Sequence, residues 1–317
     1  MKESMVKLRL NFGGGIMIKK FIFFVFLSLF LIFSFNSCTT RNISQQGSFA
    51  ASDLIDNGNF LAQNGKFYEA LGEYKRALAI DNSSLIAKRN MGIVLVKLGR
   101  YQEGINYFYD VRSFYESDPE FLYFFGEGLR GAKSYHQSLD FYIKAREIDP
   151  DDSRILKSMG WVYLKIENIK EAEKVIAPYF KMHKNDLQAI LIMSHVLNKK
   201  KKYSQSIKIL KNFEDSRFSI VGRDKSLVET EKILLLESLG NAYEGLNNCK
   251  KALKIYSIVL QLRPFLVSSL NASARCNLAI NQKSGALAKL EKALTSEPNN
   301  PETLYLLGNV YLASDSK

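Results

Sequence analysis

Residues 119–152, with the sequence PEFLYFFGEGLRGAKSYHQSLDFYIKAREIDPDD, contain the pattern that decides the fold. Gly126 is the eighth residue of this 34-residue stretch, and Gly58, Gly92 and Gly160 stand at the same place in neighbouring stretches of equal length. A fixed period of this size is the signature of a repeat architecture, in which each unit is one supersecondary structure.

Two further positions keep the size of their side chain from unit to unit. Twelve residues after each glycine stands a small residue: Ala70, Gly104, Ser138 or Ala172. Four residues later stands a large one: Tyr74, Phe108, Tyr142 or Ile176. Small residues facing large apolar ones at helical spacing predict two closely packed antiparallel helices in each unit.

The register continues towards the C-terminus with one interruption. Units one to five cover residues 51–220, units six and seven cover 233–300, and a half unit at 301–317 is expected to cap the seventh. Residues 221–232 break the period, either as an extension of a helix or as a loop on one face. Three interpretations of this insertion stay open: a tolerated surface insertion, a joint between two subdomains, and a contact loop.

Over residues 51–317 this pattern resembles the tetratricopeptide repeat (TPR) family. The resemblance implies an all-α fold, a right-handed superhelical solenoid of antiparallel helix pairs with about seven units and a C-terminal capping helix. One helix pair cannot bury both of its faces, so neighbouring pairs must stack. In this family the second, fifth, ninth, twelfth and thirteenth residues of each first helix line a concave groove.

Units three to five place a mixture of aromatic, charged and amide side chains at those groove positions. The candidate partner-binding residues are Tyr123, Glu127, Arg130, Lys157, Trp161, Lys165, Leu191, His195 and Asn198. Aromatic and arginine side chains dominate the energetics of protein interfaces, which favours a peptide-binding groove. The alternative for Trp161, the only tryptophan, is that it packs against a neighbouring helix as part of the core.

The N-terminus has the parts of an export signal. Lys19 and Lys20 precede an apolar run at residues 21–35, and Cys38 follows shortly after. This run is too short to span a bilayer comfortably and fits the apolar region of a signal peptide. We expect residues 1–37 to be a signal peptide like that of a bacterial lipoprotein, with Cys38 as the lipidated (palmitate-bearing) residue. An uncleaved membrane anchor is the alternative.

Two short segments flank this signal. Residues 1–16 fit no part of a signal peptide, and Met17-Ile18 followed by the two lysines is a conventional start, so we interpret 1–16 as a mis-annotated upstream extension. Residues 38–50 are rich in Ser, Thr, Asn and Gln, and they are expected to form a flexible tether between lipid and body.

The charge suggests which partners to expect. Residues 1–37 hold five basic residues and one acidic residue, so their removal lowers the net charge from +12 to +8. An exported protein does not meet nucleic acid, which leaves protein partners, anionic lipid or acidic wall polymers. Lys199, Lys200, Lys201 and Lys202 are expected at the turn between the helices of unit five, as a solvated turn or an anionic lipid contact.

The sequence favours an adaptor over an enzyme. It has only three histidines, no phosphate-binding loop and no histidine pair at metal-ligand spacing, so we expect no catalytic site, metal or cofactor. The predicted function is a membrane-anchored scaffold at the bacterial cell envelope, with the outer membrane weakly favoured because Thr39, not aspartate, follows Cys38. Alternatives are presentation of a wall polymer or small ligand to an envelope enzyme or assembly machine, and self-association through the end helices.

Two cysteines remain in the body of the chain. Cys249 is expected to begin the second helix of unit six, and Cys276 to lie late in the first helix of unit seven. Their helices should pack antiparallel, which would allow a disulfide if the Cα atoms came within about 7 Å. Free cysteine is also a common small core residue, so two buried thiols are the favoured state.

Overall fold

The computed structural model describes residues 49–217 and 225–315. The signal peptide, Cys38 and residues 38–48 of the expected tether lie outside these ranges. The chain separates into two compact units between Phe114 and Tyr115, and each is described by itself. None of the described helices combines the length and apolar character that crossing a membrane requires.

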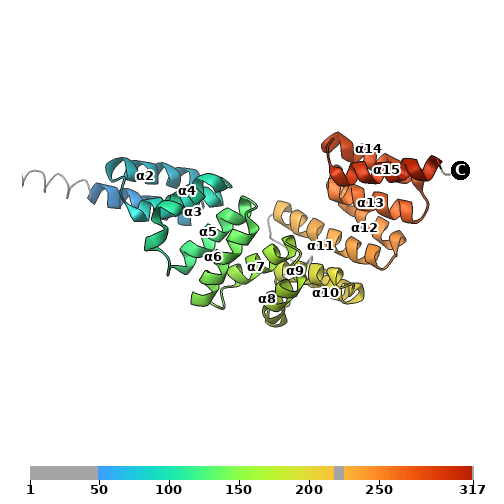
Figure 1. Ribbon diagram of the computed structural model, residues 1–317, viewed down its shortest axis with the longest axis horizontal. Helices are drawn as coiled ribbons and strands as arrows, with labels where there is room; N and C mark the ends of the chain where they lie inside the picture. Colours follow the sequence, from blue (N-terminus) through green and yellow to red (C-terminus); the bar gives the residue numbers. More distant parts are fainter. Residues whose placement is uncertain (1–48, 218–224, 316–317) are drawn as a thin grey trace, which may run out of the picture. The chain divides into compact units, whose positions relative to one another are not determined.

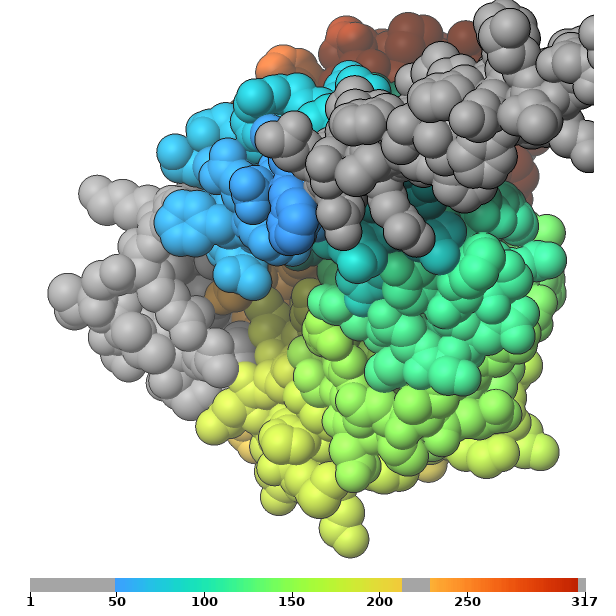
Figure 2. All heavy atoms as spheres, turned by 90° about the vertical axis from the view of Figure 1, so that its left-hand side faces the viewer, coloured from blue at the N-terminus to red at the C-terminus, as the bar shows by residue number. Residues whose placement is uncertain are grey.

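The first compact unit, which ends at Phe114, consists of helices joined by tight turns (Figure 1). A helix at residues 49–63 is followed by α2 (Phe67–Ile80), α3 (Leu85–Lys97), α4 (Tyr101–Val111) and the 3₁₀ turn η1 (Arg112–Phe114). Figure 2 shows the surface of the helix at 49–63 and of α2 in blue. Residues 49 and 50, which the sequence assigned to the tether, are already helical, because no glycine or proline separates them from the helix that follows.

The second compact unit, which starts at Tyr115, is a series of consecutive helix pairs. The pairs are α5 (Pro119–Gly131) with α6 (Tyr135–Ile148), α7 (Ser153–Lys165) with α8 (Ile169–Met182), α9 (Leu187–Lys199) with α10 (Tyr203–Arg217), α11 (Lys225–Gly245) with α12 (Cys249–Leu262), and α13 (Val267–Ala279) with α14 (Lys283–Ser296), followed by α15 (Pro301–Asp315). Members of each pair pack on one another, and each pair packs on the next. The all-α prediction is confirmed: every regular element of the described residues is helical.

Part of the segment that interrupts the repeat, residues 225–232, belongs to a helix that is longer than its counterparts. Residues 225–232 form the first turns of α11, which at 21 residues is longer than the other first helices. Of the two alternatives, a helix extension and a loop, residues 225–232 form the extension, and they contain no glycine or proline to end a helix. Residues 221–224 lie outside the described residues.

The residues that begin and end the first helix of each repeat recur with the same 34-residue period. Asp118, Asp152 and Asp186 are N-caps whose carboxylates accept backbone N–H bonds at 2.8–3.0 Å, which satisfies donors that the first turn leaves free. At the other end of the first helices, Gly65 and Gly99 have φ of 75°, and Lys133 has φ of 63°. A left-handed residue at this place ends the helix and reverses the chain.

The seam between paired helices depends on the glycine and the large residue of each unit. A Cβ built on Gly126 would lie 2.5 Å from Cε1 of Tyr142, and one on Gly58 would lie 2.5 Å from Cε1 of Tyr74. The small residues that precede these rings, Ala70 and Ser138, are fully buried. The predicted register is therefore the packing register, and the glycine makes room for the ring.

Candidate partner-binding groove

The nine predicted groove residues come from the first helices of three neighbouring repeats. Tyr123, Glu127 and Arg130 lie on α5; Lys157, Trp161 and Lys165 lie on α7; and Leu191, His195 and Asn198 lie on α9. Helix α7 contacts both α5 and α9, so the three helices form adjacent rows of one surface. The structure thus brings the three helices that carry these nine residues side by side in the second compact unit.

Glu127 is the centre of a polar network on this surface. Its Oε1 accepts hydrogen bonds from the Tyr142 hydroxyl at 2.6 Å and the Ser158 hydroxyl at 2.7 Å. Arg130 donates from Nε at 3.1 Å and from Nη2 at 2.5 Å, which forms a two-pronged ion pair with the same carboxylate. The carboxylate is thus held by groups from α5, α6 and α7, and its position is fixed.

The protonation states in this network follow from burial and from the ion pair. Burial by itself would raise the pKa of Glu127, but the hydrogen bonds and charge of Arg130, with those of Tyr142 and Ser158, lower it below its usual range. Burial and the adjacent Glu127 charge raise the pKa of Tyr142, which stays a hydroxyl donor. Glu127 is therefore ionised and Tyr142 neutral at physiological pH.

Trp161 has two cations close to its ring and packs against the core. The guanidinium of Arg130 is 5.3 Å from the centre of the indole ring, and the Lys165 ammonium is 4.7 Å from it. The ring is half-buried and also packs against a cluster that includes Ile176 and Ile192. One portion of the ring therefore supports the core and another is exposed to solvent, and partner binding by Trp161 stays a prediction.

Tyr123 and Lys157 are also paired within the chain. Arg154 lies over the Tyr123 ring, 4.9 Å from its centre, and burial raises the pKa of Tyr123 to about 12. Lys157 donates to Asp186 at 2.8 Å, an ion pair that joins α7 to the start of α9. Burial opposes ionisation of Asp186, but the Lys157 hydrogen bond and other donors lower its pKa below the usual range.

The three residues on α9 have different environments. Leu191 is partly buried and packs against the core cluster beneath the surface. His195 is exposed, and its Nδ1 lies 3.3 Å from the Leu191 carbonyl oxygen. Desolvation of the ring, together with the charges of Lys165 and Lys199, lowers the pKa of His195. The Oδ1 atom of Asn198 is buried without a hydrogen-bond donor.

The lysine run lies where the sequence placed it. Lys199 ends α9, Lys200 caps it, and α10 begins at Tyr203. Lys199 pairs with Glu167 at 3.0 Å and Lys200 with Glu173 at 2.6 Å, which ties the turn to the preceding repeat. Lys201 and Lys202 are exposed. Half of the run thus has acidic partners within the chain.

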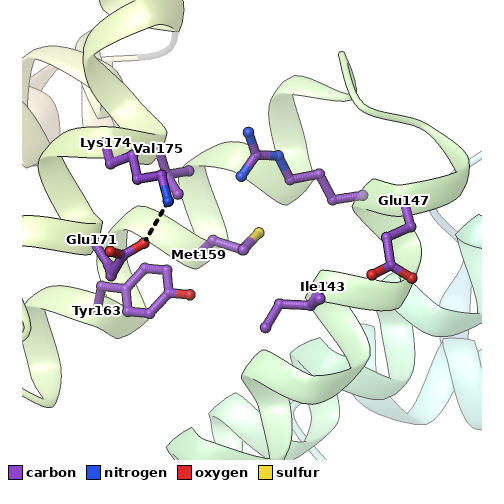
Figure 3. A pocket seen from close by; sticks show the side chains of 8 residues that line it. Ile143, Glu147, Met159, Tyr163, Glu171, Lys174 and Val175 are labelled. Atoms are coloured by element: carbon purple, nitrogen blue, oxygen red, sulfur yellow. Dashed lines mark ion pairs between the residues drawn. The ribbon is translucent and has the colours of Figure 1, made fainter.

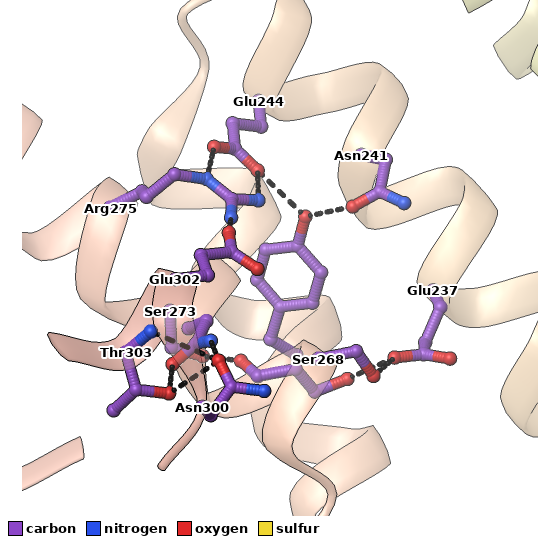
Figure 4. A network of polar contacts seen from close by, with 12 residues as sticks. Glu237, Asn241, Glu244, Ser268, Ser273, Arg275, Asn300, Glu302 and Thr303 are labelled. Carbon is purple, nitrogen blue, oxygen red and sulfur yellow. Dashed lines mark hydrogen bonds and ion pairs between the residues drawn. The ribbon is translucent and has the colours of Figure 1, made fainter. Parts of the chain in front are cut away.

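A second polar network, which the sequence analysis missed, lies on α11, α12, α13 and α15 (Figure 4). Arg275 donates to Glu244 at 2.7 Å and 3.1 Å and also forms an ion pair with Glu302. The Tyr256 hydroxyl donates to Asn241 at 2.8 Å and to Glu244 at 3.1 Å. Burial alone would lower the pKa of Arg275, but the Glu244 hydrogen bonds and charge raise it.

This second network continues with hydroxyl and amide groups. Glu237 accepts from Ser268 at 2.6 Å and from Ser269 at 2.7 Å. Asn241, Glu244 and Arg275 occupy the ninth or twelfth positions of the first helices in units six and seven. The position rule that was applied to units three to five would have found them.

A shallow pocket lies away from the nine groove residues, between α6, α7 and α8 (Figure 3). It has a volume of about 260 Å³ and is lined by Ile143, Arg146, Glu147, Met159, Tyr163, Glu171, Lys174 and Val175. Glu171 and Lys174 form an ion pair at 3.6 Å, and two basic residues balance two acidic ones. The pocket therefore has no convergent charge that would select a ligand.

The described residues contain no group of three or more His, Cys, Asp or Glu side chains that could hold a metal ion. Cys249 and Cys276 are buried as free thiols and belong to one core cluster. Burial and the neighbouring Cys249 raise the pKa of Cys276, so this thiol stays protonated and unreactive. The favoured state of two buried thiols is the one that the structure shows.

Comparisons with known proteins identify the fold. No family model and no curated protein sequence match the chain. Solved structures do: a tetratricopeptide repeat protein from Parabacteroides merdae ATCC 43184 is 16% identical, with a TM-score of 0.64 over 83% of this chain and 99% of that one. A chain of the APC/C hetero-tetramer Cut9-Hcn1 is 15% identical, with a TM-score of 0.59 over 81% of this chain and 55% of that one.

A thermophilic TPR protein from Thermus thermophilus is also similar, with 18% identity and a TM-score of 0.50 over 61% of this chain and 99% of that one. Identities this low establish a common fold and leave the function of each protein its own. The helix pairs, the 34-residue register and these structures together show that the chain has the tetratricopeptide-repeat fold.

Proposed function

We propose that this protein is a scaffold whose groove on α5, α7 and α9 binds a segment of a partner protein. The observation that carries the proposal is the arrangement around Trp161 and Tyr123, whose rings are partly accessible and flanked by cations. A rigid aromatic side chain that costs little entropy to hold is the usual anchor of an interface.

The charge of the groove indicates what kind of segment it binds. The groove positions of units three to five hold five basic and two acidic residues: Arg130, Arg154, Lys157, Lys165 and Lys199 against Glu120 and Glu127. All of these basic residues except Lys165 already form ion pairs, with Glu127, Asp152, Asp186 and Glu167. Lys165 is exposed and has no acidic partner among the described residues. An acidic segment with an apolar or aromatic residue complements this surface, since opposite charge steers association and fixes register.

The Cut9-Hcn1 structure supports a protein partner, because there a chain of the same fold forms a complex with another protein. Presentation of an acidic wall polymer is the second candidate, and the same basic and aromatic side chains favour it. The two differ in what should be held at the groove: a defined stoichiometric protein or a heterogeneous carbohydrate.

Site-specific photocrosslinking in cells tests the proposal. A photoreactive residue replaces Lys165 in the groove, and in a matched control it replaces Lys144, which is exposed on α6. We expect one protein to crosslink at position 165 and not at position 144. Capture of a polymer at position 165, or the same proteins at both positions, would contradict a protein-binding groove.

We further propose that the protein is anchored by lipid at Cys38 and works at the bacterial cell envelope, with the outer membrane favoured by Thr39. Support comes from Lys19, Lys20 and the apolar run at 21–35. We expect the Cys38→Ala protein to become soluble or to stay unprocessed, as detergent-phase partitioning and gel mobility would show. Parental partitioning and mobility of this variant would mean that another element anchors the chain.

A further inference from the structure

One end of the first compact unit carries a group of exposed apolar and aromatic side chains. Tight turns at 64–66, 81–84 and 98–100 make each helix of this unit antiparallel to the next. The start of the helix at 49–63, the end of α2, the start of α3 and the end of α4 therefore meet at one end, which we call the entry end. Its large apolar side chains are 47–70% exposed: Phe49, Ile80, Ile86, Tyr109 and Phe114.

Two positions at the entry end differ from their counterparts in the later repeats. The Ser84 hydroxyl caps α3, 3.3 Å from the backbone nitrogen of Ala87, whereas aspartates cap α5, α7 and α9. The second residue of α3 is Ile86, while α5, α7 and α9 have glutamate, arginine and glutamine there. At these positions the entry end is therefore neutral and apolar, and exposed apolar side chains that gather in one place mark an interaction site.

The charges at the entry end suit the surface of a bilayer. Asp110 pairs with Lys88 at 3.8 Å, and Asp81 accepts hydrogen bonds from the Ser83 hydroxyl and backbone N–H at 2.6 and 3.0 Å. Arg112 is exposed, has no acidic partner among the described residues, and lies 5.8 Å from the centre of the Tyr109 ring. Aromatic rings lie at the level of lipid headgroups, where a neighbouring cation can meet lipid phosphates.

The chain also enters the first compact unit at this end. Ten residues, 39–48, separate Phe49 from Cys38, and even a fully stretched segment of this length spans only about 40 Å. A lipid on Cys38 would therefore hold the entry end close to the bilayer. Contact with the same bilayer is then an intramolecular event, so a few apolar side chains are enough to maintain it.

We propose that the entry end lies on the bilayer surface, with Phe49, Ile86 and Phe114 among the headgroups and Arg112 at lipid phosphates. This inference rests on the lipid anchor proposed above at Cys38. The exposed rings and Ile86 enter only the interfacial layer, as the apolar faces of peripheral membrane helices do. The opposite end of the first compact unit, with the turns at 64–66 and 98–100, then faces water.

Quenching of tryptophan fluorescence by brominated lipid tests this contact. The full lipidated chain is reconstituted in vesicles of phosphatidylethanolamine and phosphatidylglycerol, with and without bromine on the acyl chains. Phe114→Trp places a reporter at the entry end. Tyr68→Trp is the matched control, because Tyr68 is equally accessible at the start of α2, about 20 Å away along that helix. The parental chain gives the background from Trp161.

We expect brominated lipid to quench the Phe114→Trp chain and to shift its emission to the blue, while the Tyr68→Trp chain stays at the parental level. Phe49→Trp, a second reporter at the entry end, should be quenched as well. Adding Arg112→Glu to the Phe114→Trp chain should reduce the quenching. Adding Lys66→Glu, at the opposite end, should leave it unchanged. All of these positions are exposed, so each chain should keep the parental melting temperature.

Flotation with the vesicles separates this inference from the proposed anchor. A chain that floats, but whose Phe114→Trp form is quenched no more than the parent, would overturn the membrane contact and leave the anchor standing. Equal quenching of the Phe114→Trp and Tyr68→Trp chains would also overturn it. A chain that does not float would overturn both proposals. Shielding of the Phe114→Trp reporter from acrylamide before lipid is added would show that protein covers the entry end instead.

Discussion

Repeats three and four use the same positions for different purposes. In repeat three the Tyr142 ring fills the space at Gly126, and its hydroxyl fixes Glu127 on the groove surface. In repeat four the nearest atom to a Cβ on Gly160 would be a methyl carbon of Ile192 at 3.2 Å, and Ile176 offers no hydroxyl. The ninth residue there is Trp161, which is held by neighbouring cations and apolar side chains.

The comparison teaches that the seam of a repeat decides what its groove can present. A tyrosine in the seam requires a polar acceptor on the surface, because a buried hydroxyl without a partner is costly. An aliphatic seam frees the same surface position for an aromatic anchor. The sequence of the second helix thus limits the binding chemistry of the first.

Replacing Gly126 and Gly160 by alanine, one at a time, should show the largest difference in stability between repeats three and four. Gly126→Ala would place a methyl group 2.5 Å from the Tyr142 ring, and we expect it to lower the free energy of unfolding by about 1–3 kcal/mol. Urea denaturation of the parental and variant chains measures this difference.

Gly160→Ala is the matched control for this experiment. Its methyl group needs Ile192 to move by only a few tenths of an ångström, and alanine is favoured over glycine in a helix by about 1 kcal/mol. The two effects oppose each other, so the change in unfolding free energy should be close to zero. Equal losses for both variants would contradict the distinction between the two seams.

Tyr142→Phe should reveal the cost of losing the hydroxyl alone. The ring still fills the seam, but Glu127 loses a donor at 2.6 Å, and we expect a loss of about 1.5 kcal/mol in unfolding free energy. The reverse change, Phe108→Tyr in repeat two, places a hydroxyl next to the buried Ile93 and should also destabilise the fold. A stability gain from Phe108→Tyr would be inconsistent with the pairing of seam and ninth residue.

The pH dependence of stability should change with Glu127→Gln. Because the pKa of Glu127 is lower in the folded chain than its ordinary value of 4.5, its ionised form stabilises the fold above that pH. This contribution is lost as the pH falls through the folded pKa. We therefore expect the difference in unfolding free energy between the parental and Glu127→Gln chains to shrink on acidification below pH 4.5. A constant difference would assign Glu127 a role that does not depend on its charge.

The sequence predicted the fold well because the packing rule is local and repeated. The eighth-position glycine and the large residue of the second helix, Gly126 and Tyr142 in repeat three, are sixteen residues apart in each comparable repeat. Their contact can therefore be predicted from the register. The helical start of α11 was left open, because residues 225–232 have no counterpart in the other repeats.

The groove was predicted less completely. The positions of Tyr123 and Trp161 followed from the register, but their pairing with Arg154, Arg130 and Lys165 depends on side-chain conformations that the repeat does not specify. Leu191 is partly buried, because part of this apolar side chain packs against the neighbouring core cluster.

The most direct test of the groove as a binding surface is the effect of Trp161→Ala on both partner affinity and stability. The protein that crosslinks at position 165 is titrated against the parental and variant chains, with a melting curve for each. We expect the affinity to fall at least about tenfold, since interface anchors cost about 2 kcal/mol or more when truncated. The partly exposed ring should leave a folded, cooperatively melting chain. Unchanged affinity, or an unfolded Trp161→Ala chain, would show that the tryptophan serves the core and that the partner binds elsewhere.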